Sequence, residues 1–358
     1  MSTYLVTGVA GFIASRVAEM LLADGHTVVG IDNLNDYYDV RLKHYRLGRI
    51  ARQAGVSEAE VIGQGLSADG WKNSAPITNN LKPITLSSER FEFRVLDIEN
   101  IKELDELFAT RKFDAVFNLA ARAGVRYSLL HPELYRRTNV LGEENVLKCQ
   151  VKYGVQKHVV ASSSSVYAGC PMPFTEDATL GQIQSPYAET KRQAEVLARD
   201  YHLKHGLDVS VLRYFTVFGP AGRPDMAPFR FIKWIDEGQP IELFGDGTQA
   251  RDFTYVDDIA RGTVFAVKPL GYQVINLGGG RNPISLQTVI AFIEKALGKK
   301  AKINGQPFHL ADIKETWADI TKAKRLLGWS PTVTPQEGFQ RTVDWHVANR
   351  SWLKDIKL

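Results

Sequence analysis

The first 215 residues alternate short apolar runs with longer amphipathic segments, and no other feature restricts the fold as strongly. This alternation is typical of βαβ units, in which parallel strands form a sheet that helices cover on both faces. The sequence therefore predicts an α/β fold with a Rossmann-type, doubly wound parallel sheet. Strands are predicted at residues 4–7, 27–31, 91–96, 115–119, 158–163 and 209–214, and helices at residues 12–24, 41–52, 101–110, 132–153 and 185–205.

The alternation weakens after residue 218. Helical patterns at 229–237, 286–297 and 335–348 are separated there by turns that contain Gly and Pro. We assign residues 1–215 to the Rossmann-type domain and residues 216–358 mainly to a smaller C-terminal α/β lobe that binds substrate. Residues 55–88, within a segment of about 53–90, are rich in Gly, Ser, Asn and Pro and lack clear periodicity. Such a long loop is uncommon inside a compact domain. It is predicted to be an insertion outside the sheet, mobile or folded over the site.

Composition argues against several classes of protein. The net charge is only +4 and no block of Lys and Arg occurs, so nucleic-acid binding is not predicted. Cys149 and Cys170 are too few for a disulfide framework and are expected to be reduced. No apolar run approaches the roughly 18 residues that span a bilayer. The N-terminal residues run into a strand pattern instead of a signal peptide. We expect a cytoplasmic protein with no membrane partner and no metal site.

A glycine-containing turn joins the first predicted strand to the first predicted helix. Gly8 permits a tight turn, and Gly11 lets backbone amides at the helix N-terminus approach a pyrophosphate. Asp32 lies near the end of the second strand, about 20 residues on, where a carboxylate can accept hydrogen bonds from ribose hydroxyls. Because this carboxylate would repel a 2′-phosphate, NAD is predicted rather than NADP. Asp97 is expected at the adenine, and the nicotinamide side is expected to be lined by Leu119, Ala120 and Ala121.

Tyr187 and Lys191 form the predicted catalytic pair. Residues four apart lie on one face of a helix, so the Lys191 ammonium can lie beneath the Tyr187 ring. Hydride removal from a secondary alcohol needs a base, and free tyrosine, with a pKa of about 10, is a poor one at neutral pH. The ammonium and a positive nicotinamide ring would lower that pKa.

A Tyr four residues before a Lys is also common on solvated helices, so the pair alone decides little. The serine run at 162–165, after the fifth predicted strand, favours the catalytic interpretation. Ligands of such folds bind at the carboxyl edge of the sheet. A serine hydroxyl there can pass hydrogen bonds between Tyr187 and the reacting oxygen.

These motifs resemble the extended short-chain dehydrogenase/reductase family, and within it the nucleotide-sugar epimerases. The resemblance is carried by the turn at 7–13, Asp32-Asn33, the serine run, the Tyr187/Lys191 pair and residues 251–258. It implies that Tyr187 is the base, Lys191 its partner, and a serine of the run, best Ser163 with Ser164 and Ser165 beside it, the proton relay. The implied cofactor residues are Gly8, Gly11, Phe12, Ile13, Asp32, Asn33, Asn35, Asp97, Ile98, Leu119, Ala120, Ala121, Asn139, Tyr187, Lys191 and Phe215.

Four stretches resemble the UDP-glucuronate 4-epimerases in particular, namely residues 32–40, 123–128, 213–220 and 222–227. The resemblance implies reversible conversion of UDP-glucuronate to UDP-galacturonate, in which NAD takes hydride from C4 and returns it to the opposite face of a 4-keto sugar. The implied substrate residues are Arg126, Thr216, Arg223, Arg251 and Asp312.

Among these residues, Arg251 is expected at the diphosphate. Arg223 offers a planar guanidinium for the uronate carboxylate, with Thr216 as a second candidate. The alternative is that Arg223 is a surface residue of an exposed loop and Arg126 a residue at a helix start.

Other functions remain open at the level of the sequence. The 4-epimerases of UDP-glucose and UDP-N-acetylglucosamine are the alternatives within the same reaction. Related dehydratases and decarboxylases typically carry Glu directly before the Val-Tyr of the serine loop, where this chain has Ser165, so plain epimerisation is favoured. An NAD-binding sensor without turnover is the alternative from another class, and the complete set of Tyr187, Lys191 and serines argues against it. The resemblance also implies a homodimer that pairs through the helices at 132–153 and 185–205.

Overall fold

The chain folds around an eight-stranded sheet with the order β12-β7-β6-β5-β1-β2-β4-β3. The computed structural model describes residues 1–57, 60, 85–281, 283–308 and 313–358. Every pairing in the sheet is parallel except that of β3 with β4. The predicted Rossmann-type α/β fold is confirmed. The strands are β1 (Thr3–Thr7), β2 (Thr27–Asp32), β3 (Thr85–Ser87), β4 (Phe91–Val95), β5 (Ala115–Asn118), β6 (Lys157–Ser163), β7 (Asp208–Tyr214) and β12 (Tyr272–Leu277).

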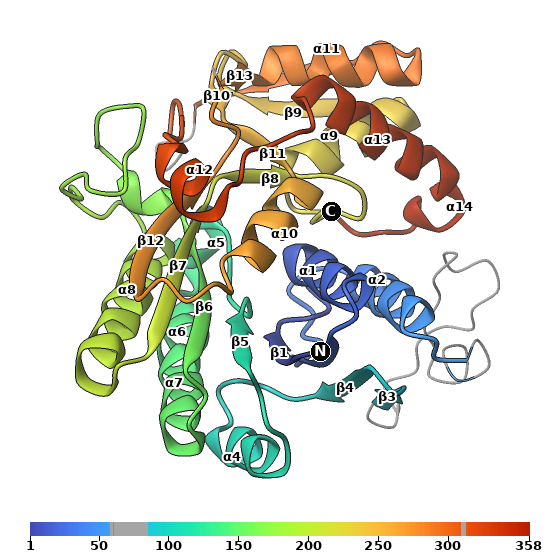
Figure 1. The fold of residues 1–358 in the computed structure, drawn as a ribbon. Helices are drawn as coiled ribbons and strands as arrows, with labels where there is room; N and C mark the ends of the chain where they lie inside the picture. The colour runs from blue at the N-terminus through green and yellow to red at the C-terminus, as the bar shows by residue number, and fades with distance from the viewer. Residues whose placement is uncertain (58–59, 61–84, 282, 309–312) are drawn as a thin grey trace.

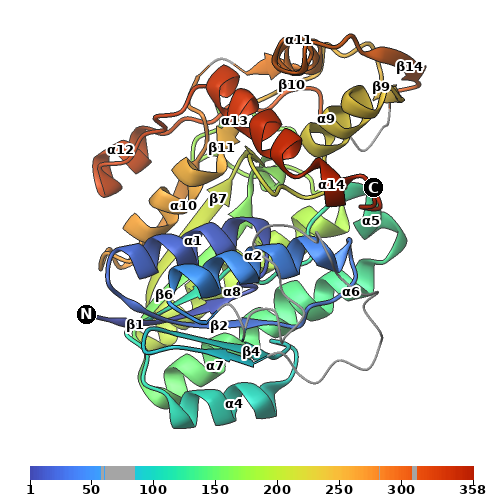
Figure 2. The ribbon, with the colours of Figure 1, turned by 90° about the vertical axis from the view of Figure 1, so that its right-hand side faces the viewer.

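Helices cover both faces of this sheet (Figures 1 and 2). In Figure 2, α1 (Phe12–Ala23) and α2 (Val40–Gln53) lie above the strands, and α4 (Ile101–Thr110) and α7 (Gly142–Tyr153) lie below them. α10 (Val256–Phe265) packs against α1, and α8 (Pro186–His205) packs against α7. Because helices bury both faces, the central strands carry nearly continuous apolar runs. The apolar cores on the two faces are separate clusters.

The helix predicted at residues 132–153 is present but is not uniform. It begins as α6 (Pro132–Arg136), passes through a π-helical turn at Arg137–Leu141 and continues as α7. Pro132 occupies the first turn, where its missing N–H costs no hydrogen bond. A π-helical turn is rare and is frequently found at functional sites. Asn139, one of the predicted cofactor residues, lies in this turn.

The prediction that residues 53–90 stay outside the sheet is wrong for β3. This strand pairs antiparallel with β4 at the edge of the sheet. Leu86 is buried in the core, while Thr85 and Ser87 on either side are exposed. A three-residue strand with one apolar residue is too short to produce the alternating pattern that predicts a strand. α2 also extends to Gln53, and residues 58–59 and 61–84 lie outside the described part of the chain.

A smaller lobe lies beyond the end of the sheet at which β7 leads into β8 (Figure 1). The helices predicted at 229–237, 286–297 and 335–348 are present there and surround a core of their own. The sheet takes β12 from beyond residue 215, so this boundary does not separate the sheet from the smaller lobe, and the domain division stays a prediction. The remaining elements are β8 (Thr216–Phe218), α9 (Ala227–Glu237), β9 (Pro240–Phe244), β10 (Ala250–Arg251), β11 (Phe253–Tyr255), β13 (Ile284–Ser285), α11 (Leu286–Leu297), β14 (Lys302–Gln306), α12 (Thr321–Leu327), α13 (Pro335–Ala348) and α14 (Arg350–Leu353).

A search of the described residues for a membrane span found no helix that is both long enough and apolar enough to cross a bilayer.

Candidate active site

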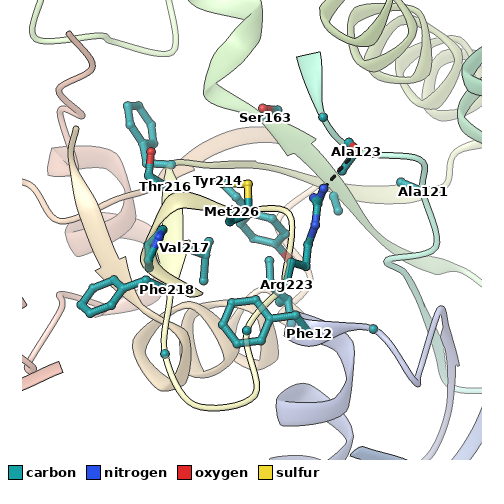
Figure 3. Close-up of a pocket in the computed structure, with 18 of the residues that line it drawn as sticks. Phe12, Ala121, Ala123, Ser163, Tyr214, Thr216, Val217, Phe218, Arg223 and Met226 are labelled. Carbon is teal, nitrogen blue, oxygen red and sulfur yellow. Dashed lines mark hydrogen bonds between the residues drawn. The ribbon is translucent and has the colours of Figure 1, made fainter. Parts of the chain in front are cut away.

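Two adjoining cavities lie between the sheet and the smaller lobe. The larger has a volume of about 410 Å³, and Figure 3 shows Phe12, Ser163, Thr216 and Arg223 among the side chains around it. The smaller has a volume of about 100 Å³ and lies past the ends of β2 and β4. The two share lining residues and therefore form one groove. The shared residues are Gly8, Gly11, Tyr37, Tyr38, Leu119 and Ala121.

Most residues that the sequence predicted for the site line this groove. Arg126 and Asn139 line neither cavity, and Asp312 lies outside the described residues. The larger cavity is lined by Gly8, Gly11, Phe12, Ile13, Leu119, Ala121, Ser163, Ser164, Ser165, Tyr187, Lys191, Phe215, Thr216, Arg223 and Arg251. The smaller cavity adds Asp32, Asn33, Asn35, Asp97, Ile98 and Ala120.

The glycine turn between β1 and α1 has no room for side chains. Gly8 has a φ of +66°, and a Cβ atom on it would lie 2.8 Å from the Cα of Ala120. A Cβ atom on Gly11 would lie 2.8 Å from the carbonyl oxygen of Gly8. No side chain caps the N-terminus of α1 at Gly11, so the backbone amides of its first turn face the groove. This is the arrangement in which a helix N-terminus holds a pyrophosphate.

Asp32 lies at the end of β2 with its carboxylate already engaged. Its two oxygens accept hydrogen bonds from the backbone N–H of Ala10 (3.2 Å) and of Leu34 (2.8 Å). The Lys43 ammonium lies 3.4 Å from the same carboxylate, and both side chains are buried. The structure places Asp32 where a ribose-binding residue is expected. The neighbouring positive charge, which the sequence analysis missed, weakens the repulsion expected toward a 2′-phosphate.

Amide and guanidinium groups line the rest of the smaller cavity. The Asn33 amide donates a hydrogen bond to Asp97 (2.8 Å), and Arg122 donates one to the side-chain oxygen of Asn35 (3.3 Å). The Nε atom of Arg122 is buried and has no hydrogen-bond partner among the described residues. A polar pocket with a spare donor, next to the glycine turn, fits the adenosine half of a dinucleotide.

Tyr187 is positioned by the start of α8. Ser185 caps this helix by accepting a hydrogen bond from the backbone N–H of Ala188, and Pro186 follows in the first turn. The backbone N–H of Tyr187 donates to the Ser128 hydroxyl at 3.1 Å. The Ser163 hydroxyl, at the end of β6, favours the ionised form of the Tyr187 phenol by lowering its pKa. The predicted base and its predicted relay therefore line the same cavity.

Burial dominates the protonation of the catalytic pair. It raises the pKa of the Tyr187 phenol, although the Ser163 hydroxyl and the charge of Arg223 act in the opposite direction. Burial lowers the pKa of Lys191 to about 8, against the influence of the Glu143 and Glu195 carboxylates. The Lys191 ammonium donates a hydrogen bond to the Ala161 carbonyl at 2.8 Å. The lowering of the Tyr187 pKa that is expected beside a positively charged nicotinamide ring stays a prediction.

Asn139 holds the walls of the groove together. Its amide nitrogen donates to the Arg122 carbonyl and to the Thr190 hydroxyl, each at 3.0 Å, and its amide oxygen accepts from the Arg122 N–H at 2.8 Å. Thr190 lies on α8, next to Lys191. The π-helical turn therefore connects the loop after β5 to the catalytic helix. Asn139 has no position on the groove surface, and its contact with a cofactor stays a prediction.

Arg223 lies in the loop between β8 and α9, with Asp225 two residues further on. Its Nε donates to one Asp225 oxygen at 3.0 Å and its Nη2 to the other at 2.5 Å. Nη2 also donates to the Ala123 carbonyl at 3.2 Å, as Figure 3 shows. The guanidinium carbon lies 5.6 Å from the centre of the Tyr37 ring. Arg223 is thus a fixed wall of the larger cavity and not a surface residue.

The two other predicted arginines lie at different depths. Arg251 lines the larger cavity, and its guanidinium donates to the carbonyls of Ala250 (2.9 Å) and Lys314 (3.2 Å). Arg126 lies in the first turn of α5 (Val125–Leu130), with its guanidinium 4.1 Å from the centre of the Phe244 ring. This stacking directs Arg126 toward β9 of the smaller lobe. Its contact with substrate stays a prediction.

Comparisons with known proteins show which family the chain belongs to. The model of a family described as "NAD dependent epimerase/dehydratase family" matches residues 4–278. A UDP-glucuronate 4-epimerase of Thermodesulfobacterium geofontis is 51% identical over 358 residues, and the alignment covers 100% of both chains. UDP-glucuronate 4-epimerase 4 of Arabidopsis thaliana is 36% identical, over 97% of this chain and 75% of that one. The chain belongs to the NAD dependent epimerase/dehydratase family. The resemblance to nucleotide-sugar epimerases is confirmed.

Solved structures of this family have the same fold. The UDP-glucuronic acid 4-epimerase of Bacillus cereus, in complex with UDP-glucuronic acid and NAD, superposes with a TM-score of 0.81 at 34% identity and covers 99% of both chains. The UDP-glucose 4-epimerase of Thermotoga maritima, with UDP-glucose, superposes with a TM-score of 0.78 at 27% identity, over 96% of this chain and 98% of that one.

Several residues of the groove were missed by the sequence analysis. Tyr37 and Tyr38 line both cavities, although their stretch, residues 32–40, was noted for its resemblance. Met226 likewise lies in a stretch noted for its resemblance, residues 222–227. Thr342, Trp345 and His346 had no signal, because helical periodicity shows which residues are buried but not which element they face. The missed lining residues include Tyr37, Tyr38, Lys43, Arg122, Thr138, Tyr214, Met226, Phe229, Thr316, Thr342, Trp345 and His346.

Proposed function

We propose that this chain is a UDP-glucuronate 4-epimerase, which interconverts UDP-glucuronate and UDP-galacturonate with NAD as its cofactor. The observation that carries the proposal is that Tyr187 and Ser163 line one cavity together with the glycine turn and Arg223. A dinucleotide turn, a base with a relay and a cation for a carboxylate thus meet in one place. The similarity to UDP-glucuronate 4-epimerases over the whole chain supports it.

The residues of the groove fit NAD. The amides after Gly8 and Gly11 would hold its pyrophosphate, and Asp32, Asn33 and Asp97 its adenosine half. When bound, NAD supplies a hydride acceptor and donor at C4 of the sugar. Because the cofactor ends each turnover in the form in which it began, the enzyme needs to retain it rather than exchange it.

The chain's own residues manage the proton. Tyr187 accepts the proton of the C4 hydroxyl as hydride leaves, and the Ser163 hydroxyl passes hydrogen bonds between the two oxygens. The 4-keto sugar then turns over, and Tyr187 returns the proton after hydride attack on the opposite face. A keto group at C4 lies β to the uronate carboxylate, so that carboxylate must be held to prevent its loss. Arg223, with Thr216, is the side chain proposed to hold it.

A panel of nucleotide sugars tests the proposal. Purified protein with its bound NAD is incubated with UDP-glucuronate, UDP-glucose and UDP-N-acetylglucosamine, and the configuration at C4 is read by NMR. We expect UDP-galacturonate from UDP-glucuronate, with no net NADH and no loss of CO₂. Turnover confined to a neutral sugar would move the chain to another 4-epimerase. NADH that accumulates without an epimer would refute epimerisation.

The protein is further proposed to be a cytoplasmic homodimer. Leu141, Val196 and Leu203, on the π-helical turn and α8, are 42%, 54% and 67% exposed. Apolar side chains exposed along two neighbouring helices are typical of a helix-pairing interface. Both cysteines are free in the structure, as in proteins of a reducing compartment. Light scattering coupled to size-exclusion chromatography measures the mass, and a monomer at micromolar concentration would exclude the dimer.

A further inference from the structure

The guanidinium that is proposed to bind the substrate carboxylate already binds a carboxylate of its own chain. Arg223 and Asp225 form a bidentate pair through Nε and Nη2 of the arginine, at 3.0 Å and 2.5 Å. Nη2 is shared further with the Ala123 carbonyl and the Tyr37 hydroxyl, at 3.2 Å and 3.4 Å. Among the described residues, Nη1 has no hydrogen-bond partner. One edge of the fork is therefore occupied, and the other is left for a ligand.

The Asp225 carboxylate is ionised in this position. Burial by itself would raise its pKa, but the charge and hydrogen bonds of Arg223 outweigh burial and hold the pKa of Asp225 below its usual range. The side chains of Arg223 and Asp225 are 18% and 28% exposed, so water screens the pair only in part. The hydroxyl of Tyr37 contacts both partners, at 3.4 Å each. The pair thus has one geometry and almost no net charge.

This neutralisation has opposite consequences for the two kinds of sugar. A uronate carboxylate that reaches Nη1 lies close to a second carboxylate, and like charges in one site repel each other. A neutral sugar leaves no buried, unpaired guanidinium behind, because Asp225 already satisfies Arg223. Leaving such a charge unpaired is the main way in which an arginine excludes a neutral ligand. Asp225 therefore weakens the binding of the charged sugar and tolerates the neutral one.

We propose that Asp225 is a specificity-determining positioning residue, which acts through Arg223 to reduce the preference of the site for a sugar that carries a carboxylate. It fixes the orientation of the Arg223 guanidinium so that only Nη1 contacts the substrate. It also neutralises the charge of Arg223 when no substrate carboxylate is bound. This inference rests on the proposed function, since it assumes that Arg223 faces C6 of the sugar. It adds a residue that does not itself touch the substrate.

Binding measurements on inactive protein test this role without interference from turnover. Two proteins that both carry Tyr187→Phe are compared, one with Asp225 intact and one with Asp225→Asn. Calorimetry gives the Kd of UDP-glucuronate and of UDP-glucose for each. Asn keeps the shape and one hydrogen bond to Arg223 but removes the charge. We expect UDP-glucuronate to bind roughly tenfold more tightly to the Asn variant, the change typical of one charged partner. UDP-glucose should bind equally well or more weakly, so the ratio of the two Kd values rises about tenfold.

Two further variants separate charge from shape. Asp225→Glu keeps the negative charge and should leave the ratio close to that of the Asp225 protein. In an Arg223→Met background, Asp225→Asn should have no effect on the ratio, because the residue through which it acts is missing. An unchanged ratio in Asp225→Asn overturns the inference, and so does a shift that persists without Arg223.

If the variants do not fold, binding of the two sugars to the protein with Asp225 intact provides a separate test. UDP-glucose should bind it within about a hundredfold of UDP-glucuronate, since one fully unpaired charge would impose more than that. Exclusion of UDP-glucose by a far larger factor overturns the inference. Failure of the proposed function is a separate result, because it appears as absence of UDP-galacturonate with active enzyme. An enzyme that epimerises UDP-glucuronate but shows no role for Asp225 refutes this inference alone.

Discussion

Tyr187 and Lys191 lie one turn apart on α8. Burial raises the pKa of Tyr187 and lowers the pKa of Lys191, so it favours the neutral form of each side chain. Their shared face was predicted from the spacing of four residues alone. The depth of the pair was not, because desolvation depends on the residues of other elements that cover it. The pairing of Arg223 with Asp225 was missed for a related reason. Arg223 and Asp225 are two residues apart in a loop, and the distance between such side chains cannot be predicted until the backbone conformation is known.

Replacing Tyr187 by Phe removes the base but little volume. We expect epimerisation to fall by about 10²–10⁴-fold, the usual contribution of general-base catalysis, while NAD remains bound. Turnover is followed by NMR, and bound NAD is measured after denaturation. Tyr201→Phe on the same helix is the matched control, because Tyr201 lies outside both cavities as described. Near-full turnover by Tyr187→Phe would show that another group is the base.

The Lys191 ammonium is predicted to destabilise the fold at neutral pH. A fall of its pKa from 10.5 to about 8 means that the unfolded chain binds this proton more tightly. Stability should therefore rise with pH between about 8 and 10.5 and carry the full penalty below 8. That penalty is roughly 3 kcal/mol. Replacing Lys191 would remove the penalty but would also remove the hydrogen bond to Ala161, which stabilises the fold by about 1 kcal/mol.

Lys191→Met should accordingly be inactive yet more stable than the parent at pH 7, by about 2 kcal/mol. Urea unfolding at pH 7 and pH 10 measures the difference, which should shrink as the pH rises. Lys204→Met, an exposed position of the same helix, is the control and should change little. A Lys191→Met variant that is less stable at pH 7 would contradict the predicted penalty.

Arg223→Met keeps much of the side-chain volume and removes the charge proposed to hold the uronate carboxylate. A charged hydrogen bond is worth about 1.5–3 kcal/mol, so kcat/KM for UDP-glucuronate should fall about ten- to a hundredfold. Activity on UDP-glucose should hardly change. A carboxylate that is no longer held can also leave, so traces of a decarboxylated 4-keto-pentose are expected by mass spectrometry. Arg192→Met is the control, because Arg192 is a half-buried residue of α8 that lines neither cavity. An equal loss on both sugars would remove the physical basis of the glucuronate assignment.

At the scale of elements, the parallel strands and long helices were predictable because period-2 and period-3.6 patterns repeat over enough residues to be recognised. β3 and the π-helical turn at Arg137–Leu141 were not. β3 has a single buried residue, Leu86. The π-helical turn inserts one residue into a helix whose overall pattern stays helical on both sides. Both departures lie at functionally or topologically special places, where local patterns are weakest.

The segment between α2 and β3 gives a prediction at this scale. Replacement of residues 58–84 by a short Gly-Ser linker should leave a folded protein that binds NAD, because the edge strand is retained. The longer deletion of residues 55–88 also removes the buried side chains of Val56 and Leu86. It should lower the free energy of unfolding by about 2–5 kcal/mol, as for other large apolar deletions. Thermal unfolding of both proteins decides. If both deletions were equally stable, β3 would not belong to the cooperative core.

At the scale of the whole molecule, the two lobes are held together by segments that return across the boundary near residue 215. β12 comes back to pair with β7 in the large sheet. The C-terminal helices α13 and α14 return to α2, where Trp352, Leu353 and Ile356 form a cluster with Leu42 and Tyr45. Long-range returns of this kind are invisible to patterns of neighbouring residues, so the sequence indicated two lobes but not how they are joined.

Trp352 connects this junction to the substrate cavity. It is buried, its ring lies 5.3 Å from that of Tyr45 on α2 and 6.2 Å from that of Trp345 on α13, and Trp345 lines the larger cavity. The Trp345 indole also donates a hydrogen bond to the Tyr45 hydroxyl at 2.8 Å. Removing the Trp352 ring would leave a void next to Trp345, and this void should loosen one wall of the cavity as well as the junction.

Trp352→Ala should lower the free energy of unfolding by about 3–5 kcal/mol and raise the KM for UDP-glucuronate, while kcat changes less because Tyr187, Lys191 and Ser163 lie in the other lobe. Trp329→Ala is the matched control. Trp329 is equally buried but belongs to the core between the sheet and α1, so its loss should destabilise the protein by a similar amount without affecting KM. Thermal unfolding and steady-state kinetics below the melting temperature of both variants give the comparison. If the two variants showed the same KM as the parent, the junction would stabilise the fold without shaping the site, and substrate binding would depend on the loop at Arg223 rather than on how the lobes are joined.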